Sequence, residues 1–397
     1  MLAMAAPIVS MEWSALERGL LHAIFTRLPS DVDALHFRHV CHRWRAAAGA
    51  GAPVSRPWFV LLPSDGSPGP HRHAYLRLAG CRRRRRRTRA RPVRMMDATV
   101  KGSAPDACAT SASRGWLAVN AGGRLLLRDP VSRVDVPLPA FDPAYRLLDV
   151  FLSDDPLHAP GRWTVFATFT RKDYHYAGHA LAFHRAGDAE WVRLDQAQET
   201  SHGRQYLGLE FFRGRVYALL GCGRVAVCDL DARRLVVSSV AFVPPSWGHV
   251  QACIMDCGGN LMFVQVARRF VVTRSRCFGR RYHPRYAAKV FKIEIAADGT
   301  PVALLDVQGI GDYAMFVAPR GHAFALPASG FPSVKGGCVY HFATKWDTGI
   351  VSEMVITDLH GACRSKLVRK LPLAGQWAPL SWLCPRRPLL GNTPARR

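Results

Sequence analysis

The chain has 397 residues, of which 49% are hydrophobic and 21% are charged, so a chain that is disordered throughout is excluded. Its length allows one small and one large domain with a sizeable core. The formal net charge of +25 would favour a nucleic-acid partner. However, only eight of the 54 basic residues are lysines, so a coding bias toward arginine accounts for much of the excess, and we expect no nucleic-acid partner.

The cellular location follows from what the sequence lacks. It has no run of about 20 apolar residues that would span a membrane, and its first ten residues lack the basic start and the length of a secretory signal. The 11 cysteines are odd in number and include no CxxC pair. We therefore expect reduced thiols, no membrane partner, and a location in the nucleus, the cytoplasm or both.

The first predicted element is a helix near the N-terminus. Large apolar residues recur there at helical spacing and would form one wide apolar face over about three and a half turns. Pro29 would close this helix. The residues that form the face are Leu16, Leu20, Leu21, Ile24, Phe25 and Leu28.

Two more helices are expected directly after the first. Ser30 and Asp33 have the spacing of a capping box at the start of a second helix. Trp44 falls on a third, shorter one. A unit of roughly 40 residues lies near the size at which a chain needs a metal, a disulfide or a partner to be stable. Because this segment has no metal or disulfide pattern, we expect a partner surface to cover part of the apolar stripe; the alternative is an ordinary helical hairpin with these leucines as its core.

This N-terminal segment resembles the F-box in the order and spacing of its residues. The resemblance implies docking onto a Skp-type adaptor and, through the adaptor, onto the cullin of a ubiquitin ligase. The segment departs from the family pattern at Glu17 to Gly19, where the family has Pro-x-Glu. The matching residues are Trp13, Leu16, Leu20, Leu21, Ile24, Leu28, Asp31, Val40, Cys41, Trp44 and Arg45, and the stripe expected to bind the adaptor comprises Trp13, Leu16, Leu20, Leu21, Ile24, Leu28, Val40, Cys41 and Trp44.

The segment after the helices contains a run of arginines. Residues 51–57 form a linker of small residues, and an apolar strand begins at Trp58. Residues 82–94 hold nine arginines and no acid, so this stretch predicts a solvated loop. Its core is a possible nuclear-import run; the alternative is a loop enriched in arginine by drift. The run comprises Arg82, Arg83, Arg84, Arg85, Arg86 and Arg87.

From about residue 112 to residue 360, short strands alternate with tight glycine or aspartate turns. Examples are the runs at Val216 and Val225, at Leu261 and Phe270, and at Val290 and Val302. Such hairpins predict an all-β domain. Because blades of about 40 to 45 residues would fit six or seven times, we expect a six- or seven-bladed β-propeller over residues 58–365. The strand at Trp58 would pair near Met354–Asp358 to close the ring.

The order of these pieces resembles the KIB-type β-propeller that follows the F-box in a large plant family. Each piece is moderately specific, and together with the F-box they extend over most of residues 11–360. The resemblance implies a protein-binding propeller. The segments that carry it are Ser113–Leu117, Leu127–Ser132, Val136–Pro139, Gly309–Phe316 and Phe331–Tyr340.

Several motifs suggest other chemistry but have simpler explanations. Gly221–Ala226 and Gly309–Ala314 have the GxGxxA spacing of a dinucleotide site, yet strand-forming residues follow each one, so hairpin turns are expected. His175 and His179 are four residues apart in a strand-rich region, where that spacing does not chelate a metal. Arg268–Arg285 mixes arginines with aromatic residues, as single-stranded nucleic acid sites do, although Phe270 is expected in a strand core.

The sequence therefore predicts three helices in an F-box at 11–50, a linker at 51–57, a β-propeller at 58–365 and a basic flexible tail at 385–397. The predicted function is that of the substrate-recruiting subunit of a Skp-cullin-F-box ubiquitin ligase, with no catalytic residue, metal or cofactor. Its partners would be the adaptor, a cullin and an unknown protein substrate. The alternatives are an adaptor-independent protein-binding propeller and a basic nucleic-acid-binding protein.

Overall fold

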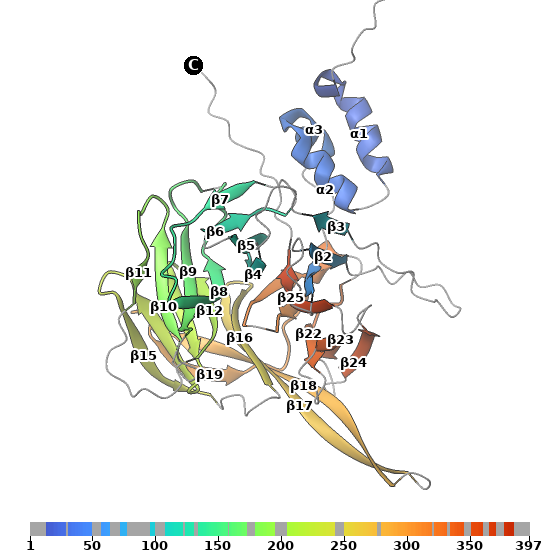
Figure 1. Cartoon of the computed structure of the whole chain (residues 1–397). Coiled ribbons are helices and arrows are strands. Elements are labelled where there is room, and N and C mark those ends of the chain that lie inside the picture. The colour runs from blue at the N-terminus through green and yellow to red at the C-terminus, as the bar shows by residue number, and fades with distance from the viewer. Residues whose placement is uncertain are drawn as a thin grey trace, which may run out of the picture. The chain divides into compact units, whose positions relative to one another are not determined.

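The computed structural model divides the chain into two compact units, residues 1–56 with 386–397 and residues 57–385 (Figure 1). Several predicted segments lie outside the described residues: residues 51–56 of the linker, the loop 82–94 with its run Arg82–Arg87, and the tail 385–397. The described residues are 13–28, 31–49, 57–63, 72–77, 96–99, 108–121, 124–130, 134–157, 159–172, 179–194, 205–242, 250–275, 279–319, 321–331, 334–344, 351–359, 365–370 and 377–384.

The first unit, called the helical unit here, contains the three predicted helices: α1 (Arg18–Arg27), α2 (Asp31–Val40) and α3 (His42–Ala48). A 3₁₀ turn, η1 (Trp13–Ala15), precedes them. The first helix has ten residues and is shorter than predicted, because Glu17 is extended and its side chain makes no capping hydrogen bond.

The core of the helical unit is small and aromatic. Leu21 is 1% exposed, and the Phe37 ring lies between Phe25 and Trp44, with ring centroids 5.3 and 4.6 Å away. His22 Nδ1 lies 3.1 Å from the carbonyl oxygen of Ala47, which ties α1 to α3. The helices therefore pack on one another through a few side chains.

The second unit, called the propeller unit here, contains five regular blades, each a four-stranded antiparallel sheet. Their strands are β25 (Trp377–Leu383), β1 (Trp58–Pro63), β2 (Arg72–Arg77) and β3 (Met96–Thr99); β4 (Cys108–Ser113), β5 (Trp116–Ala121), β6 (Arg124–Arg128) and β7 (Asp135–Pro137); β8 (Tyr145–Leu152), β9 (Thr164–Arg171), β10 (Ala180–Arg185) and β11 (Val192–Arg193); β12 (Tyr206–Phe212), β13 (Arg215–Leu220), β14 (Arg224–Asp229) and β15 (Arg234–Ala241); and β16 (Val250–Cys257), β17 (Asn260–Ser275), β18 (Gly279–Ile295) and β19 (Pro301–Asp306).

One further sheet departs from this pattern. It has five strands in the order β21-β20-β22-β23-β24, and β20 and β22 run parallel. The prediction of six or seven repeating blades is therefore wrong, because the regular blades among the described residues number five. The blade number was predicted by dividing the length of the domain into equal blades. This division failed because one irregular sheet occupies residues 313–370. Its strands are β20 (Tyr313–Val317), β21 (Ala323–Pro327), β22 (Cys338–Thr344), β23 (Val351–Asp358) and β24 (Ser365–Lys370), with a 3₁₀ turn, η2 (Ala328–Gly330), after β21.

The first and last strands of the propeller unit pair with each other. Trp58 lies opposite Leu383 in the ladder between β1 and β25, so the predicted pairing of β1 with Met354–Asp358 is wrong. Pro379 within the run WAPLSWL disfavours a strand in the sequence, and a register shift between Val60 and Leu61 accommodates it.

The predicted hairpins are mostly confirmed. Val216 pairs with Cys228, and Glu294 pairs with Ala303. The predicted pairing of Leu261 with Phe270 is wrong, because both residues lie in β17, a single strand of 16 residues. With β18, of 17 residues, it forms a long hairpin that extends beyond the other sheets (Figure 1).

The inner strands of the propeller unit contact one another in the pairs β25–β4, β4–β8, β12–β16 and β16–β21. The turn between β20 and β21 reaches two other blades. A Cβ atom on Gly321, at φ 60°, would lie 1.9 Å from the carbonyl oxygen of Leu207, and His322 stacks on Phe151 with ring centroids 4.3 Å apart. Only glycine permits this close backbone approach.

Candidate functional site

The nine residues of the predicted adaptor-binding stripe fall into three groups by burial. Leu16 and Leu21 are buried, at 8% and 1% exposure, and belong to the core of the helical unit. A second group is partly buried and comprises Ile24, Leu28, Cys41 and Trp44. The third group, called the exposed apolar triad here, comprises Trp13 (64% exposed), Leu20 (49%) and Val40 (55%).

The division between Leu20 and Leu21 follows from helix geometry. Residues one apart on a helix point in directions about 100° apart, whereas residues four apart share a face. Leu21 and Phe25 therefore point together into the core. Leu20 shares its face with Ile24, which is only partly buried. Leu20 thus extends the apolar surface of α1 beyond the side that faces the core.

Trp44 has a role inside the helical unit. Its indole Nε1 donates a hydrogen bond to the carbonyl oxygen of Trp13, with 3.0 Å between the two atoms. Its ring packs on Phe37 at the core. Trp44 therefore holds η1 against α3 and positions the exposed Trp13.

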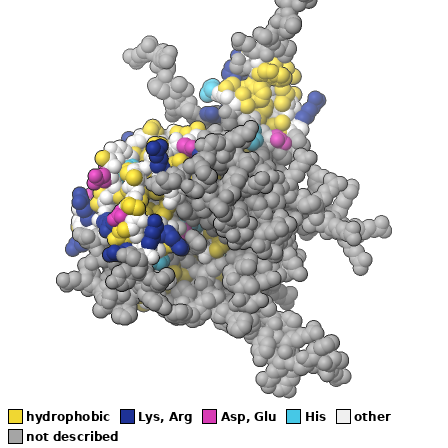
Figure 2. Space-filling model, in the orientation of Figure 1, with side chains coloured by type: hydrophobic (Ala, Val, Ile, Leu, Met, Phe, Trp, Pro, Cys, Tyr) yellow, Lys and Arg dark blue, Asp and Glu magenta, His cyan; other side chains and the backbone are white. Residues whose placement is uncertain are grey.

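Hydrophobic side chains gather on the visible face of the helical unit (Figure 2). The triad supplies three of the nine large hydrophobic side chains that are exposed among the described residues, although the helical unit is much the smaller of the two. Buried apolar area contributes about 25 cal/mol per Å² to binding or folding. A partner that covered this face would therefore gain substantial binding energy.

The propeller unit contains a carboxyl group, that of Glu210, which is only 13% exposed and helps to link blades. Arg114, in the turn between β4 and β5, donates one hydrogen bond to the carbonyl oxygen of Leu152 at 2.8 Å and another to Glu210 Oε1 at 3.1 Å. Burial raises the pKa of Glu210 to about 7, and the nearby positive charge of Arg114 opposes that shift. This arrangement ties together the blades that contain β4, β8 and β12.

The Cys253 thiol, whose pKa is affected by Glu210, is not an activated nucleophile. Burial raises the pKa of the Cys253 thiol, and Glu210 adds to the shift, so this thiol stays protonated near neutral pH. Asp256 lies close enough to raise the pKa of Glu210 further. No local pattern predicts the contact between Arg114 and Glu210, because the two residues are 96 positions apart in the chain.

The two glycine motifs lie in turns, as predicted. Gly223 and Gly311 have φ angles of 84° and 60°, and the strands β14 and β20 follow directly. Neither motif begins a helix, so neither can offer a helix N-terminus to a pyrophosphate.

The predicted histidine and basic segments are only partly described. His175 lies outside the described residues. Burial lowers the pKa of His179, while Asp149 opposes this shift. Among the described residues no cluster of three or more His, Cys, Asp or Glu side chains could hold a metal, and no helix is long and apolar enough to cross a membrane. The backbone of Arg268–Arg285 lies in the long hairpin of β17 and β18 where described; nucleic-acid binding by it stays a prediction.

Residues 89–362 match the model of the KIB1-4 beta-propeller family. The chain belongs to this family. The matched segment begins after β2 and ends before β24, so the helical unit lies outside it. The KIB1-4 match extends through every inner strand of the regular blades except β25.

A relative of the chain extends the similarity to the helical unit. F-box protein SKIP23 of Arabidopsis thaliana is 26% identical over 420 aligned positions, which cover 94% of this chain and 96% of the relative. With the KIB1-4 match, this confirms the resemblance to plant F-box proteins with a KIB-type propeller. Whether the nine stripe residues contact an adaptor stays a prediction.

Two solved structures show weak overall similarity to this KIB1-4 chain. A chain from a study of two prolyl endopeptidases is 12% identical with a TM-score of 0.28; the match covers 90% of this chain and 54% of that one. The arabinofuranosidase arb93a of Fusarium graminearum is 9% identical with a TM-score of 0.28, over 82% of this chain and 91% of that one. The present chain thus spans about half the length of the prolyl endopeptidase chain.

Proposed function

We propose that this chain is the substrate-recruiting subunit of a Skp-cullin-F-box ubiquitin ligase. The helical unit would dock on a Skp-type adaptor, and the propeller unit would bind a protein substrate. The observation that carries the proposal is the exposed apolar triad on a helical unit that already has its own core. Family membership and the similarity to an F-box protein along nearly the whole chain support it.

The proposed role is positional and needs no catalytic residue in this chain. Holding a substrate beside a ubiquitin-charged enzyme raises the effective concentration of the substrate's lysines at that enzyme, as linked binding sites do. The described residues offer apolar docking and polar turns for that task. We also propose the nucleus or the cytoplasm as the place where it acts.

The proposal is tested by co-purification of the full chain with a Skp-type adaptor. We expect the unaltered chain to retain the adaptor. Leu20→Asp and Val40→Asp should each reduce retention by a factor of about 100 or more, because an interface would then bury an unpaired carboxylate. Both positions are exposed in this unit, so neither change should affect its folding by more than about 0.5 kcal/mol.

The matched control is Val302→Asp. Val302 is 53% exposed, close to the values for Leu20 and Val40, but it lies on β19 of the propeller unit. This variant should retain the adaptor fully. Failure of the unaltered chain to retain the adaptor, or an equal loss with Val302→Asp, would contradict the proposal. The first of these outcomes is what an adaptor-independent propeller predicts.

A further inference from the structure

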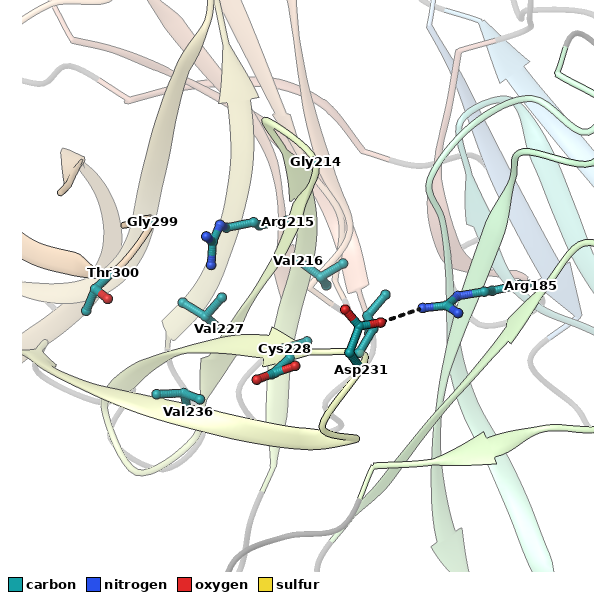
Figure 3. A pocket seen from close by; sticks show the side chains of 12 residues that line it. Arg185, Gly214, Arg215, Val216, Val227, Cys228, Asp231, Val236, Gly299 and Thr300 are labelled. Atoms are coloured by element: carbon teal, nitrogen blue, oxygen red, sulfur yellow. Dashed lines mark ion pairs between the residues drawn. The ribbon is translucent and has the colours of Figure 1, made fainter. Parts of the chain in front are cut away.

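A pocket with a volume of about 560 Å³ opens on the propeller unit (Figure 3). It lies between the end of β10 and three turns, which join β12 to β13, β14 to β15 and β18 to β19. This volume is within the range of ligand-binding clefts and exceeds the space that one side chain fills. All of its lining residues belong to the propeller unit.

One wall of the pocket is apolar. Val227 is buried, at 8% exposure, and Val236, which lies opposite it in the ladder between β14 and β15, is 42% exposed and offers its side chain to the opening. Val216 and Cys228 also line the pocket, but they lie opposite each other on the other face of the blade, in a different core cluster. The wall therefore suits the apolar part of a ligand.

The acidic residues at the pocket already have partners within the chain. Asp231 lies 3.7 Å from a guanidinium nitrogen of Arg185 (Figure 3). Asp229 accepts a hydrogen bond of 2.9 Å from the backbone of Ala232 and lies 3.8 Å from Arg234 Nε. These two carboxylates therefore contribute little uncompensated negative charge to the pocket.

A third acid, Asp298, lies beside the lining residue Thr300. Its carboxylate accepts hydrogen bonds of 2.8 and 3.0 Å from the backbone and the hydroxyl of Thr300. These bonds lower the pKa of Asp298, with a smaller effect from the charge of Arg215. The Asp298 carboxylate is thus already hydrogen-bonded within its own turn.

Arg215 differs from the other charged residues at the pocket. Among the described residues, none lies within hydrogen-bond or ion-pair distance of its guanidinium group, although its charge acts on the carboxylate of Asp298. Its side chain extends toward Gly299 (Figure 3), where a Cβ atom would lie only 2.4 Å from Arg215 Nε. The Tyr217 hydroxyl donates a 3.0 Å hydrogen bond to the Gly299 carbonyl and fixes this turn. Because Gly299 has no side chain, it leaves the space that the Arg215 side chain occupies.

We propose that this pocket binds a peptide segment with an acidic side chain, whose anionic group pairs with Arg215 while a neighbouring apolar residue packs on Val227 and Val236. A guanidinium group binds a carboxylate or a phosphoryl group through two parallel hydrogen bonds, which makes such a pair both strong and directional. The inference rests on the proposed function in one respect: the peptide would belong to the substrate that the chain recruits.

The test measures binding of the full chain, without adaptor, to immobilised peptides by surface plasmon resonance. The probes are the acetylated peptide Ala-Val-Asp-Leu-Ala on a neutral linker and its versions with phosphoserine or asparagine in place of the aspartate. We expect the chain to bind at least one anionic peptide, and about tenfold or more tighter than the asparagine peptide. The two anionic probes show whether a carboxylate or a phosphoryl group is preferred.

Arg215→Glu should weaken binding of the anionic peptide by a factor of about ten or more. The control is Arg162→Glu, the same charge change at an exposed arginine in the β8–β9 turn, outside the pocket; it should leave binding unchanged. Equal binding of the asparagine peptide, no binding of any probe, or equal losses in the two variants would overturn the proposal. Adaptor retention by Arg215→Glu should be normal, so failure here is distinct from failure of the proposed ligase role.

Discussion

The helical unit and the propeller unit cover their apolar side chains to different degrees. The helical unit has one small core cluster and leaves Trp13, Leu20 and Val40 about half exposed or more. Among the described residues, the propeller unit has four core clusters, in which residues such as Phe166 and Val264 are fully buried. The small unit has apolar surface to offer a partner, whereas the large unit stabilises itself.

The exposed apolar residues of the propeller unit have a simpler explanation. Of the six found among the described residues, four lie on two strands at the outer edges of blades: Val236 and Val237 on β15, and Val302 and Leu305 on β19. Side chains on edge strands commonly meet solvent. The triad of the helical unit instead lies beside a core that is too small to cover it, and this difference supports the proposal that the triad binds a partner.

The largest expected effect is on the stability of the propeller unit. Trp382 is 3% exposed, donates a hydrogen bond of 3.0 Å from Nε1 to the carbonyl oxygen of Val317, and meets the Phe316 ring edge-on at 5.0 Å. Trp382→Ala should lower the free energy of unfolding of the propeller unit by about 3 to 5 kcal/mol. Chemical denaturation followed by circular dichroism measures this change.

Trp382→Phe serves as the control, because it removes the hydrogen bond but keeps most of the packing. It should cost less, about 1 to 2 kcal/mol. A loss below about 1 kcal/mol for Trp382→Ala would mean that the packing of β25 against β20 does not help to hold the propeller unit together.

A smaller effect, dependent on pH, is expected at Glu210. Its pKa is about 7 in the folded chain and 4.5 in the reference state, so the folded state binds more protons between these values. Stability should therefore be greatest below about pH 4.5 and fall as pH rises through about 7, by up to about 3 kcal/mol from this group.

Glu210→Gln removes the titrating group while keeping its shape. Compared with the unaltered chain, this variant should gain stability at about pH 8 and little or none at about pH 5. Thermal melts of both proteins at the two pH values measure the difference. Identical pH dependence in the two proteins would show that Glu210 is ionised at little cost in the folded chain.

The sequence could predict features that depend on neighbouring residues. The three helices follow from apolar spacing, and hairpins such as Val216 with Cys228 follow from a glycine turn between two strand-forming runs. The pairing of β1 with β25 could not be found in this way, because Pro379 hides the last strand. The parallel pairing of β20 with β22 also depends on a fold that no local pattern encodes.

The candidate sites show the same limit. The sequence identified the apolar stripe, but the division between Leu20 and Leu21 depends on how the three helices pack. At the pocket, Arg215 and Gly299 lie far apart in the chain, and only the fold brings them together. Helical spacing therefore predicts which residues are apolar and periodic, whereas burial decides which of them can meet a partner.

The central claim is that the apolar surface of the helical unit docks on an adaptor while the propeller unit does not. Hydrogen exchange of the full chain with and without a Skp-type adaptor tests this most directly, because it reports on both units at once. We predict slower exchange of backbone amides in α1, α2 and α3 when the adaptor is present, and unchanged exchange in the propeller unit. Unchanged exchange in the three helices, or protection in the propeller unit alone, would contradict the account.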